Sequence, residues 1–373
     1  MRLGLDVSAV PANVAGAGRY VVELARRLPA REVDVTLVTR RSDLERWRRW
    51  SPDARWAPVV PDRRVARLAY EAWRVGVGQS THGLDVWHSP HYTMPRRRAL
   101  PTVVTIHDLT FFTNPEWHER SKVVFFRRAI TYAAAHADAL ICVSEFTAHQ
   151  LDEALPTHAP VVVAPHGVNL DTFTPRAEHD DEVIRGLDLD ASQPYLFFLG
   201  TFEPRKGLDV LLDAFETLAR ANPDLELWLA GQIGWGLAAL ESQLATHPAA
   251  HRIRRLGFVD EAALPALLRR ARCVVYPSRA EGFGLPVLEA MACGALVVTS
   301  SDTVMAEVSG DCCELAAPGD STALAAAVQT QLERSDAQRA AWGVRARSRA
   351  EAFTWEASMT MHLNAYDLAR RAR

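Results

Sequence analysis

The chain has 373 residues, of which 48% are hydrophobic and 23% are charged, and its formal net charge is −3. This composition is typical of globular proteins and excludes disordered and collagen-like chains. At about 150 residues per domain, the length predicts two to three domains. No apolar run approaches the ~18 residues of a membrane span, and the five cysteines include no C-x-x-C pair, so we expect a cytoplasmic protein without a disulfide framework or a zinc site.

Charge is distributed unevenly along the chain. Residues 1–172 carry a net charge of +4 and the remaining residues carry −7. An excess of this size is ordinary, and no basic stripe with interleaved aromatic residues accompanies it, so we expect no nucleic-acid partner. Only two of the 42 basic residues are lysines, Lys122 and Lys206. Because this chain uses arginine almost everywhere, a retained lysine is a candidate for a place where a compact ammonium group is needed.

Short apolar runs alternate with helical patterns along the whole chain. The first half contains the predicted strands 3–7, 33–39, 85–88, 102–107, 139–143 and 161–164, with helices over 18–28 and 123–136. The second half contains the predicted strands 195–200, 226–230, 255–257, 273–276, 295–299 and 312–315, with helices over 207–220, 261–271 and 285–292. Strands that are apolar on both faces and separated by helices predict parallel sheets built from right-handed βαβ units.

The series is interrupted once, between residues 174 and 193. This stretch is polar and acidic, contains Pro175 and Gly186 and is followed by Pro194, so we interpret it as a linker. Ligands of doubly wound sheets bind outside the carboxyl ends of the strands. With two such domains facing each other, the expected site is the cleft between them.

The first candidate site is the turn Gly200-Thr201-Phe202-Glu203-Pro204-Arg205-Lys206-Gly207, which follows a predicted strand and precedes a helix. Arg205 and Lys206 therefore lie on the carboxyl edge of the sheet, beside a helix N-terminus. Two cations and the backbone N–H groups of a helix start can bind a diphosphate. A solvated Arg-Lys pair is the alternative interpretation, and the scarcity of lysine favours a functional Lys206.

The second candidate site is Pro277-Ser278-Arg279-Ala280-Glu281-Gly282-Phe283-Gly284-Leu285-Pro286-Val287-Leu288-Glu289. Pro286 suits the start of a helix, and Gly282 and Gly284 allow the backbone to approach a ligand closely. Glu281 and Glu289 then flank an anion-binding helix start. Glu289 could instead complement the helix dipole, but that role does not explain the Gly-Phe-Gly before it.

Weaker signals lie in the first half. A lone histidine is usually structural, but His107, followed by Asp108 at a strand end that faces a cleft, is an equally good functional candidate. Gly16-x-Gly18 follows the first strand and lacks the third glycine of the dinucleotide-binding fingerprint. Still weaker candidates are His88, His166 and Asn169.

Two further patterns are set aside. Asp188-Leu189-Asp190 resembles a metal-binding D-x-D motif, but it lies in the acidic linker and not at a buried strand end, so we expect no metal site. The Arg/Trp-rich segment 40–50 is compatible with peripheral contact at the inner face of a membrane. A solvated amphipathic helix with its tryptophans packed inward is the preferred interpretation.

Taken together, these motifs resemble the family-4 retaining glycosyltransferases of GT-B fold, the glycosyl transferases group 1, over nearly the whole chain. The motifs that occur in the family's order are Gly16-x-Gly18-Arg19-Tyr20, His107-Asp108, Pro165-His166-Gly167-Val168, Gly200-x-x-x-Pro204-Arg205-Lys206-Gly207, Gly257-Phe258-Val259 and Glu281-x7-Glu289. The specific part is the E-x7-E motif with its internal Gly-Phe-Gly-Leu-Pro, about 75 residues after Arg205-Lys206.

The resemblance implies an α/β fold of two doubly wound Rossmann-like domains facing across a cleft. The N-terminal acceptor-side domain would span residues 1–173 and 356–373, because the last helix of this family crosses back to the first domain. Residues 174–193 would form the linker, and residues 194–355 would form the nucleotide-sugar-binding domain.

The resemblance also implies residue roles. The catalytic residues would be His107, Arg205, Lys206 and Glu281. The donor-binding residues would be Gly16, Gly18, Gly200, Phe258, Val259, Gly282, Phe283, Gly284, Leu285 and Glu289. Arg205 and Lys206 would bind the diphosphate, Glu281 would hold the transferred sugar, and His107 would reach that sugar across the cleft. The ribose would bind Glu289, the base would bind near Phe258, and Gly16 and Gly18 would face the phosphates or the acceptor.

The reaction implied is transfer of a hexose from a nucleotide sugar. Fixed cations and helix N-termini stabilise the charge that develops on the departing diphosphate, so no metal or other cofactor is expected. Residues 104–112 and 202–209 look most like bacterial mannosyltransferases, so GDP-mannose is the favoured donor and a UDP-sugar is next. The acceptor could be a glycan, a lipid-linked sugar or a small molecule. Front-face attack is favoured, and a covalent intermediate stays open.

Three other functions would make different demands on the sequence. A nucleotide-sugar epimerase on the same fold would need acid and base groups placed for proton abstraction. A non-catalytic nucleotide-sugar-binding partner would not need Lys206, Glu281 and His107 together. A two-domain oxidoreductase would need the complete dinucleotide fingerprint, which the sequence lacks.

Overall fold

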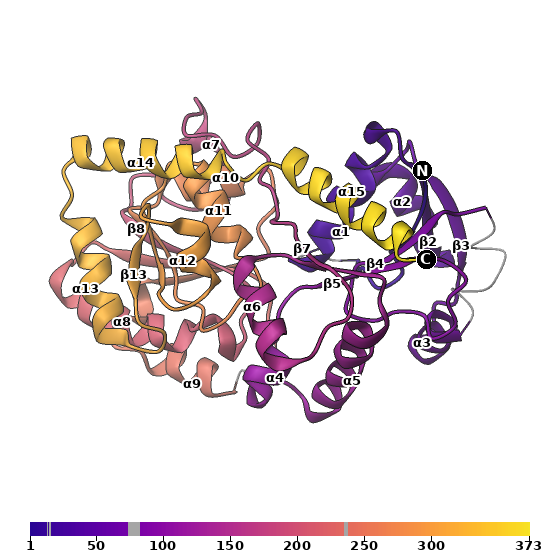
Figure 1. The fold of residues 1–373 in the computed structure, drawn as a ribbon. Helices are drawn as coiled ribbons and strands as arrows, with labels where there is room; N and C mark the ends of the chain where they lie inside the picture. Colours follow the sequence, from indigo (N-terminus) through magenta and orange to yellow (C-terminus); the bar gives the residue numbers. More distant parts are fainter. Residues whose placement is uncertain (13, 15, 74–82, 235–237) are drawn as a thin grey trace. The chain divides into compact units, whose positions relative to one another are not determined.

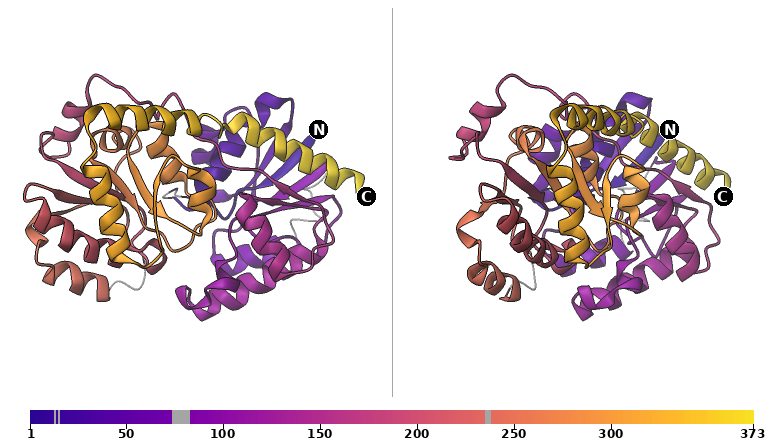
Figure 2. Two further views of the ribbon diagram at one scale, coloured as in Figure 1. Left: turned by 60° about the vertical axis from the view of Figure 1, so that its left-hand side comes forward. Right: turned by 90° about the vertical axis from the view of Figure 1, so that its left-hand side faces the viewer.

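Two parallel β-sheets, each with helices on both faces, make up the fold (Figures 1 and 2). The computed structural model describes residues 1–12, 14, 16–73, 83–234 and 238–373. One unit comprises Met1–Gly167 and Trp355–Arg373, and the other comprises Val168–Thr354. The predicted class, two doubly wound α/β domains, is confirmed.

The first unit contains a seven-stranded sheet within its described residues. Its strands are β1 (Arg2–Asp6), β2 (Asp34–Arg40), β3 (Arg55–Val60), β4 (Val86–Ser89), β5 (Thr102–Ile106), β6 (Ala139–Cys142) and β7 (Val161–Val163). Its helices are α1 (Ala17–Arg27), α2 (Leu44–Trp50), α3 (Arg64–Trp73), α4 (Thr110–Thr113), α5 (Arg120–His136), α6 (Glu145–Ala154) and α15 (Trp355–Arg371).

The second unit contains a six-stranded sheet within its described residues. Its strands are β8 (Tyr195–Leu199), β9 (Glu226–Ala230), β10 (Ile253–Gly257), β11 (Cys273–Tyr276), β12 (Val297–Ser300) and β13 (Glu314–Ala316). Its helices are α7 (Asp180–Arg185), α8 (Leu208–Ala221), α9 (Ala238–Thr246), α10 (Leu264–Arg270), α11 (Leu285–Ala292), α12 (Val304–Ser309), α13 (Ser321–Leu332) and α14 (Asp336–Ala350).

Both sheets share one strand order. The first is β3-β2-β1-β4-β5-β6-β7 and the second is β10-β9-β8-β11-β12-β13, and every strand pair is parallel. The order reverses beside β1 in the first sheet and beside β8 in the second. Ligands of such sheets bind outside the carboxyl ends of the strands at this reversal. The fold therefore points to the loops that follow β1, β4, β8 and β11.

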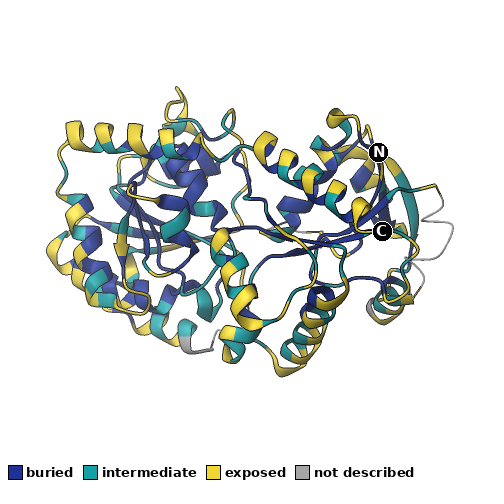
Figure 3. Cartoon of the chain, viewed as in Figure 1, coloured by how far each residue is buried: buried dark blue, intermediate teal, exposed yellow. Residues whose placement is uncertain are grey.

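Burial on both faces explains why the central strands are largely apolar. Along β6, Ala139 and Ile141 join the core on one face, and Leu140 and Cys142 join the core on the other. Figure 3 shows the central strands mostly in dark blue and much of the outward helix surface in yellow. Burying apolar area on both faces is what keeps a parallel sheet folded.

Several helices begin at residues whose side chains cap the first turn. Ser144 accepts a hydrogen bond from the Thr147 amide at 3.0 Å, and Ser335 and Gln338 form a reciprocal capping box. Such caps satisfy backbone N–H groups that a helix leaves unpaired at its start. Helices α8 and α11 begin instead at Gly207 and Gly284, with no side-chain cap. Both follow strands at the reversal point.

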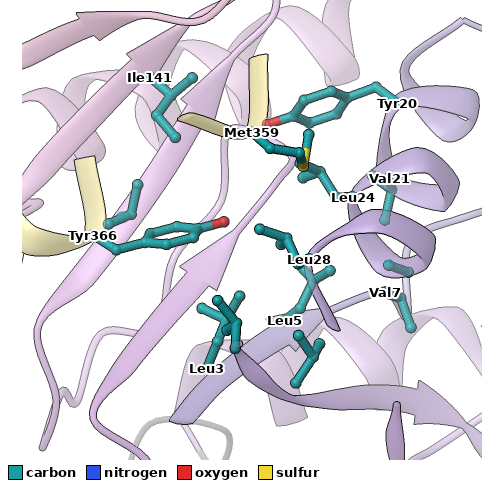
Figure 4. Close-up of a cluster of buried hydrophobic side chains, with 14 of the residues drawn as sticks. Leu3, Leu5, Val7, Tyr20, Val21, Leu24, Leu28, Ile141, Met359 and Tyr366 are labelled. Atoms are coloured by element: carbon teal, nitrogen blue, oxygen red, sulfur yellow. The ribbon is translucent and has the colours of Figure 1, made fainter. Parts of the chain in front are cut away.

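The C-terminal helix α15 belongs to the core of the first unit (Figure 4). Met359 and Tyr366 of α15 lie in one cluster with Leu24 of α1, Leu5 of β1 and Ile141 of β6. All five side chains are fully or almost fully buried. The last helix in the sequence thus packs on the first sheet and contributes to its core.

The structure differs from the predicted domain boundaries in two places. The first unit ends at Gly167 and not at residue 173, and Trp355 already belongs to it. The predicted linker 174–193 is part of the second unit, where helix α7 packs on α10. Asp180 of α7 forms an ion pair of 2.6 Å with Arg269, and Ile184 is buried. Its acidic composition reflects this pairing and surface exposure, and no free linker is formed there.

Strand β3 was missed from the sequence. It contains Arg55 and Pro58, which both lower the strand signal. Proline has no N–H to donate and is tolerated on edge strands, and β3 is the outermost strand of its sheet.

In segment 40–50, the prediction of inward tryptophans is confirmed for Trp47, which is fully buried. None of the described helices is both long and apolar enough to cross a bilayer.

Candidate functional site

The cation pair lies at the carboxyl end of β8. Arg205 and Lys206 end a short 3₁₀ turn, η5 (Pro204–Lys206), and Gly207 connects it to α8 with φ of +67°. A Cβ atom at Gly207 would lie 2.1 Å from the carbonyl oxygen of Pro277, so only glycine fits. The amide of Arg279 donates to the Arg205 carbonyl at 2.7 Å. The loops after β8 and β11 are therefore joined through their backbones.

Glu281 lies between the two cations. Its Oε2 is 2.8 Å from an Arg205 guanidinium nitrogen, and its Oε1 forms an ion pair with the Lys206 ammonium. Two hydroxyl groups also donate to Oε1, from Ser278 at 2.8 Å and from Tyr276 at 3.0 Å. The Lys206 ammonium donates to the same Tyr276 hydroxyl at 2.7 Å. The Glu281 carboxylate of the second motif thus binds both cations of the first motif.

This environment shifts the pKa of both ionic partners. Burial alone would raise the pKa of Glu281, but Arg205, Lys206 and the hydrogen bonds outweigh burial and lower it to about 2. Burial and the neighbouring Arg205 lower the pKa of Lys206, while Glu281 opposes that shift. The ammonium and the carboxylate each depend on the other to remain charged in a buried place.

A second carboxylate completes the charge balance. The Arg205 Nε is 2.7 Å from Glu203, whose side chain is mostly buried. Arg205 and Lys206 are therefore matched by Glu203 and Glu281, so these four side chains together carry no net charge. Nearby, Arg279 forms a two-point ion pair with Asp209 of α8, at 2.9 and 2.7 Å. That pair fixes the loop after β11 to the start of α8.

Helix α11 begins inside the second motif. Its cap residue Gly284 has φ of +96°, and a Cβ atom there would lie 2.5 Å from the Met305 sulfur. Phe283 is buried, Gly282 and Leu285 flank this turn, and Glu289 lies buried one turn into α11. The E-x7-E spacing therefore connects a loop carboxylate with a helix carboxylate on the same strand–turn–helix unit.

The carboxyl ends of β9 and β10 form the neighbouring edge. A Cβ atom at Gly231 would lie 1.9 Å from the Gly200 carbonyl oxygen, so two loop backbones touch directly there. Phe258 follows β10 and is 67% exposed, while Val259 is partly buried. An aromatic ring exposed at a strand end is a suitable surface for a flat base.

His107 lies in the first unit, directly after β5. It is buried, and its Nε2 donates to the Pro90 carbonyl oxygen at 2.7 Å. This bond assigns the proton to Nε2 and leaves Nδ1 as an acceptor in the neutral ring. Burial lowers the His107 pKa, which the Pro90 bond and Asp108 partly oppose. Tyr20 lies edge-on to the His107 ring at 5.2 Å.

Several of the other candidate residues from the first half of the sequence have structural roles. Asp108 accepts hydrogen bonds from the amide and hydroxyl of Thr110, at 3.1 and 2.7 Å. Gly16 is the uncapped start of α1 with φ of +46°, and Gly18 is buried in the first turn. Ala15, beside that motif, lies outside the described residues, as does residue 13. His166 is buried, and the side chain of Asn169 caps the turn formed with Asp171 and Thr172.

A buried chain of hydrogen bonds connects α15 with the first sheet. His362 Nδ1 lies 2.7 Å from the Ser358 carbonyl, which can only accept, so His362 Nε2 is an acceptor. The Tyr20 hydroxyl, at 2.7 Å, donates to that nitrogen and accepts from Thr105 at 2.8 Å. His88 Nε2 donates to Thr105 at 2.8 Å. With both imidazoles neutral, each proton in this chain has one acceptor.

The last member of the chain belongs to α15 as well. The Tyr366 hydroxyl donates to His88 Nδ1 at 2.9 Å. Burial lowers the pKa of His362 to about 4 and holds that of His88 well below its usual range. His88, a weak functional candidate from sequence, therefore has a structural role between two strands and the last helix.

Sequence reasoning missed three residues of the carboxylate cluster: Tyr276, Ser278 and Glu203. A signal existed for two of them. Tyr276 places a hydroxyl at the end of an otherwise apolar buried strand, where a polar group needs a partner, and Ser278 follows two residues later. Glu203 lies in the first motif but carried no pattern of its own.

One sequence motif resembles a metal-binding site. No group of three or more His, Cys, Asp or Glu side chains suited to hold a metal ion occurs among the residues that the structure describes. In Asp188-Leu189-Asp190, Asp190 accepts from the amide and hydroxyl of Ser192 at 2.9 and 2.7 Å. That motif is a turn on the surface of the second unit.

Fold and site together define a class of protein. Two doubly wound domains, an E-x7-E loop and helix, and a basic turn at a strand reversal are features of a nucleotide-sugar transferase. The chain matches the models of two families: "Glycosyltransferase Family 4" over residues 14–172 and "Glycosyl transferases group 1" over residues 179–349. It belongs to the group-1, family-4 glycosyltransferases, as its motifs predicted.

Similar proteins span the whole chain. The O-antigen chain mannosyltransferase B of Escherichia coli is 31% identical over 99% of this chain and 100% of its own length. A D-inositol 3-phosphate glycosyltransferase of Kineococcus radiotolerans is 29% identical over 97% of this chain and 92% of its own.

Solved structures share the fold at lower identity. Sucrose-phosphate synthase of Thermosynechococcus elongatus superimposes with a TM-score of 0.77 and 23% identity, covering 98% of both chains. Anabaena HepE in complex with UDP-glucose has a TM-score of 0.77 and 20% identity, covering 98% of this chain and 99% of that one. These likenesses confirm the predicted GT-B fold, and the chain is a glycosyltransferase.

Proposed function

We propose that this glycosyltransferase moves a hexose, with mannose favoured, from a nucleotide sugar to a glycan, lipid-linked or small-molecule acceptor, with retention of the anomeric configuration and without a metal ion. The observation that carries the proposal is the buried cluster of Arg205, Lys206 and Glu281 at the strand reversal of the second unit. It combines two fixed cations with a carboxylate and lies beside two helix starts that have no side-chain cap.

The chemistry of the cluster fits departure of a diphosphate. As the bond from the sugar to the nucleotide breaks, negative charge collects on the leaving phosphate. A buried guanidinium and ammonium that are already in place stabilise this charge with little reorganisation. Arg205 and Lys206 therefore supply the electrostatic stabilisation in this proposal, and the departing phosphate accepts the acceptor's proton.

Retention rests on the family and on the place of Glu281. That carboxylate is held by four donors, and two of them are the hydroxyl groups of Ser278 and Tyr276. We favour front-face attack by the acceptor, with Glu281 and the loop backbone from Gly282 to Leu285 holding sugar hydroxyls. Glu289 would bind the ribose, and Phe258 and Val259 would bind the base.

The donor and acceptor are proposed from the relatives. The full-length Escherichia coli relative is named as an O-antigen chain mannosyltransferase, which supports a mannosyl donor and a glycan acceptor. HepE contains UDP-glucose in its solved structure, which keeps a UDP-sugar as the second choice. GDP-mannose is the first donor that we would test.

The test is a thermal-unfolding panel with GDP-mannose, UDP-glucose, ADP-glucose and dTDP-glucose, with magnesium or with EDTA, followed by assay of nucleotide release. A ligand at 100 times its dissociation constant stabilises the folded chain by about 2.7 kcal/mol. We expect one nucleotide sugar to raise the unfolding temperature equally in magnesium and in EDTA. A requirement for magnesium would contradict the metal-free mechanism, and no shift with any donor would contradict the proposed donor site.

A further inference from the structure

The cluster contains an anion of its own, Glu281, between its two cations. One Glu281 oxygen pairs with Arg205 at 2.8 Å and the other pairs with Lys206. Lys206 is buried, with 8% of its surface exposed, and the side chain of Glu281 is 10% exposed. An anion of any other origin that pairs with both cations therefore competes with this carboxylate for their N–H donors.

A diphosphate and Glu281 therefore compete for the same two groups. Two like charges cannot share a buried site without a large electrostatic cost. If a donor diphosphate pairs with Arg205 and Lys206, as the proposed function requires, the carboxylate must exchange its ionic partners for others.

The structure supplies partners that do not depend on those cations. Ser278 donates to Glu281 Oε1 at 2.8 Å and Tyr276 donates at 3.0 Å, and both hydroxyl groups are buried. Tyr276 is on β11 and Ser278 is in the loop directly after it. These two donors can hold the carboxylate after the cations have turned to the diphosphate.

We propose that Glu281 is the resident counter-ion of Arg205 and Lys206, that the donor diphosphate displaces it, and that Tyr276 and Ser278 are positioning residues that then hold its carboxylate toward the transferred sugar. This inference rests on the proposed function. It explains why a sugar-binding carboxylate pairs with both phosphate-binding cations, and it predicts opposite effects on nucleotide and on sugar.

The first experiment compares Glu281→Gln with the wild-type chain in calorimetric binding of GDP and UDP. Removing the competing charge should tighten binding of the preferred nucleoside diphosphate by about tenfold, while transfer from the nucleotide sugar is lost. Weaker or unchanged binding of the bare nucleotide to a folded Glu281→Gln variant would overturn the counter-ion role.

The second experiment keeps every charge in place, so it does not depend on the stability of Glu281→Gln. Tyr276→Phe removes the hydroxyl that contacts Glu281 and Lys206. Tyr195→Phe is the matched control, because Tyr195 is buried on the adjacent strand β8 and donates to the Leu267 carbonyl at 2.8 Å, away from the cluster.

For Tyr276→Phe we expect kcat/KM with the nucleotide sugar to fall about tenfold, with binding of bare GDP or UDP changed less than threefold. Lys206 loses an acceptor that helps it keep its proton, so nucleotide binding should also weaken at a lower pH than in the wild type. Tyr195→Phe should change neither quantity. Equal behaviour of the two variants would overturn the positioning role of Tyr276 alone. Absence of nucleotide binding by the wild-type chain would overturn the proposed donor site, and this inference with it.

Discussion

Lys206 shows how much one side chain can contribute to this site. It is one of two lysines, and it lies buried between Glu281 and Tyr276. The other lysine, Lys122, is on the surface of α5 and pairs with Glu119 at 3.1 Å. The same residue type therefore occurs once in a buried ionic cluster and once in a solvated ion pair.

This contrast gives a matched pair of variants. Lys206→Ala should lower transfer by a hundredfold or more, because charge-assisted hydrogen bonds contribute about 1.5–3 kcal/mol each and Lys206 would make more than one to the diphosphate. Lys122→Ala should leave transfer unchanged, since an exposed ion pair contributes little. Steady-state kinetics of both variants tests this. Near-normal turnover of Lys206→Ala would remove Lys206 from the mechanism.

Glu289 allows a second test at this scale. If its carboxylate binds the ribose, Glu289→Gln should weaken binding of GDP or UDP by about tenfold, since a hydrogen bond to a charged group is lost. Binding of inorganic diphosphate, which has no ribose, should not change. Calorimetric titration with each ligand separates the two effects. If the nucleotide binds with unchanged affinity, the ribose assignment is wrong.

At the scale of elements, the site depends on two strand-to-helix turns whose backbones touch. Gly207 and Pro277 make that contact, with room for no Cβ atom. Sequence reasoning placed both turns correctly, because each follows an apolar strand and precedes a helix. It missed that the turns share backbone hydrogen bonds, since the partners are more than 70 residues apart.

The close contact predicts an unusually costly glycine substitution. Gly207→Ala forces an alanine into positive φ and presses its Cβ against the Pro277 carbonyl, so we expect a loss of about 3 kcal/mol or more. Gly319→Ala is the control, because φ there is +84° with no atom near the added Cβ. It should cost about 1–2 kcal/mol from backbone strain alone. Urea unfolding of both variants measures the difference, and equal losses would contradict the packing argument.

At the scale of the whole molecule, the C-terminal helix α15 and the first sheet belong to one folded unit. Buried, neutral histidines contribute hydrogen bonds between them. The pKa of His362 is about 4 in the folded chain because the ring is buried, against 6.5 when exposed. A folded-state pKa below the unfolded value means that the unfolded chain binds more protons between these two pH values. The stabilising contribution is therefore full above pH 6.5 and is lost as the pH falls toward 4.

His362→Gln isolates this contribution. The stability difference between wild type and variant should shrink by up to about 3 kcal/mol from pH 6.5 to pH 4, since each pKa unit corresponds to about 1.4 kcal/mol. Chemical unfolding of both proteins at several pH values tests it. A difference that does not depend on pH would show that His362 is not held neutral by the fold.

Comparison with the variant is needed because other groups titrate in the same range. Burial raises the pKa of Glu71 to about 7, with a contribution from Asp6. A raised carboxyl pKa has the opposite sign, because the stability it contributes is lost as the pH rises from 4.5 toward 7. Both proteins share this effect, so it cancels in the difference.

The sequence alone determined the fold class, most strands and helices, and the residue types of the site. These depend on local signals: apolar runs buried on both faces, glycines and prolines at turns, and two motifs of fixed spacing. It failed at the edge strand β3, where a proline is tolerated, and in 174–193, where an acidic segment packs as α7 on the second unit.

Only the tertiary structure decided which of these residues meet. Glu281 pairs with Arg205 and Lys206 across 76 and 75 residues of sequence, Tyr276 contacts both Glu281 and Lys206, and α15 packs on the first sheet. Such contacts leave no periodic trace in the sequence, because their geometry comes from strand order. Parallel crossovers bring the carboxyl ends of β8 and β11 side by side, and that arrangement places distant charges at hydrogen-bonding distance.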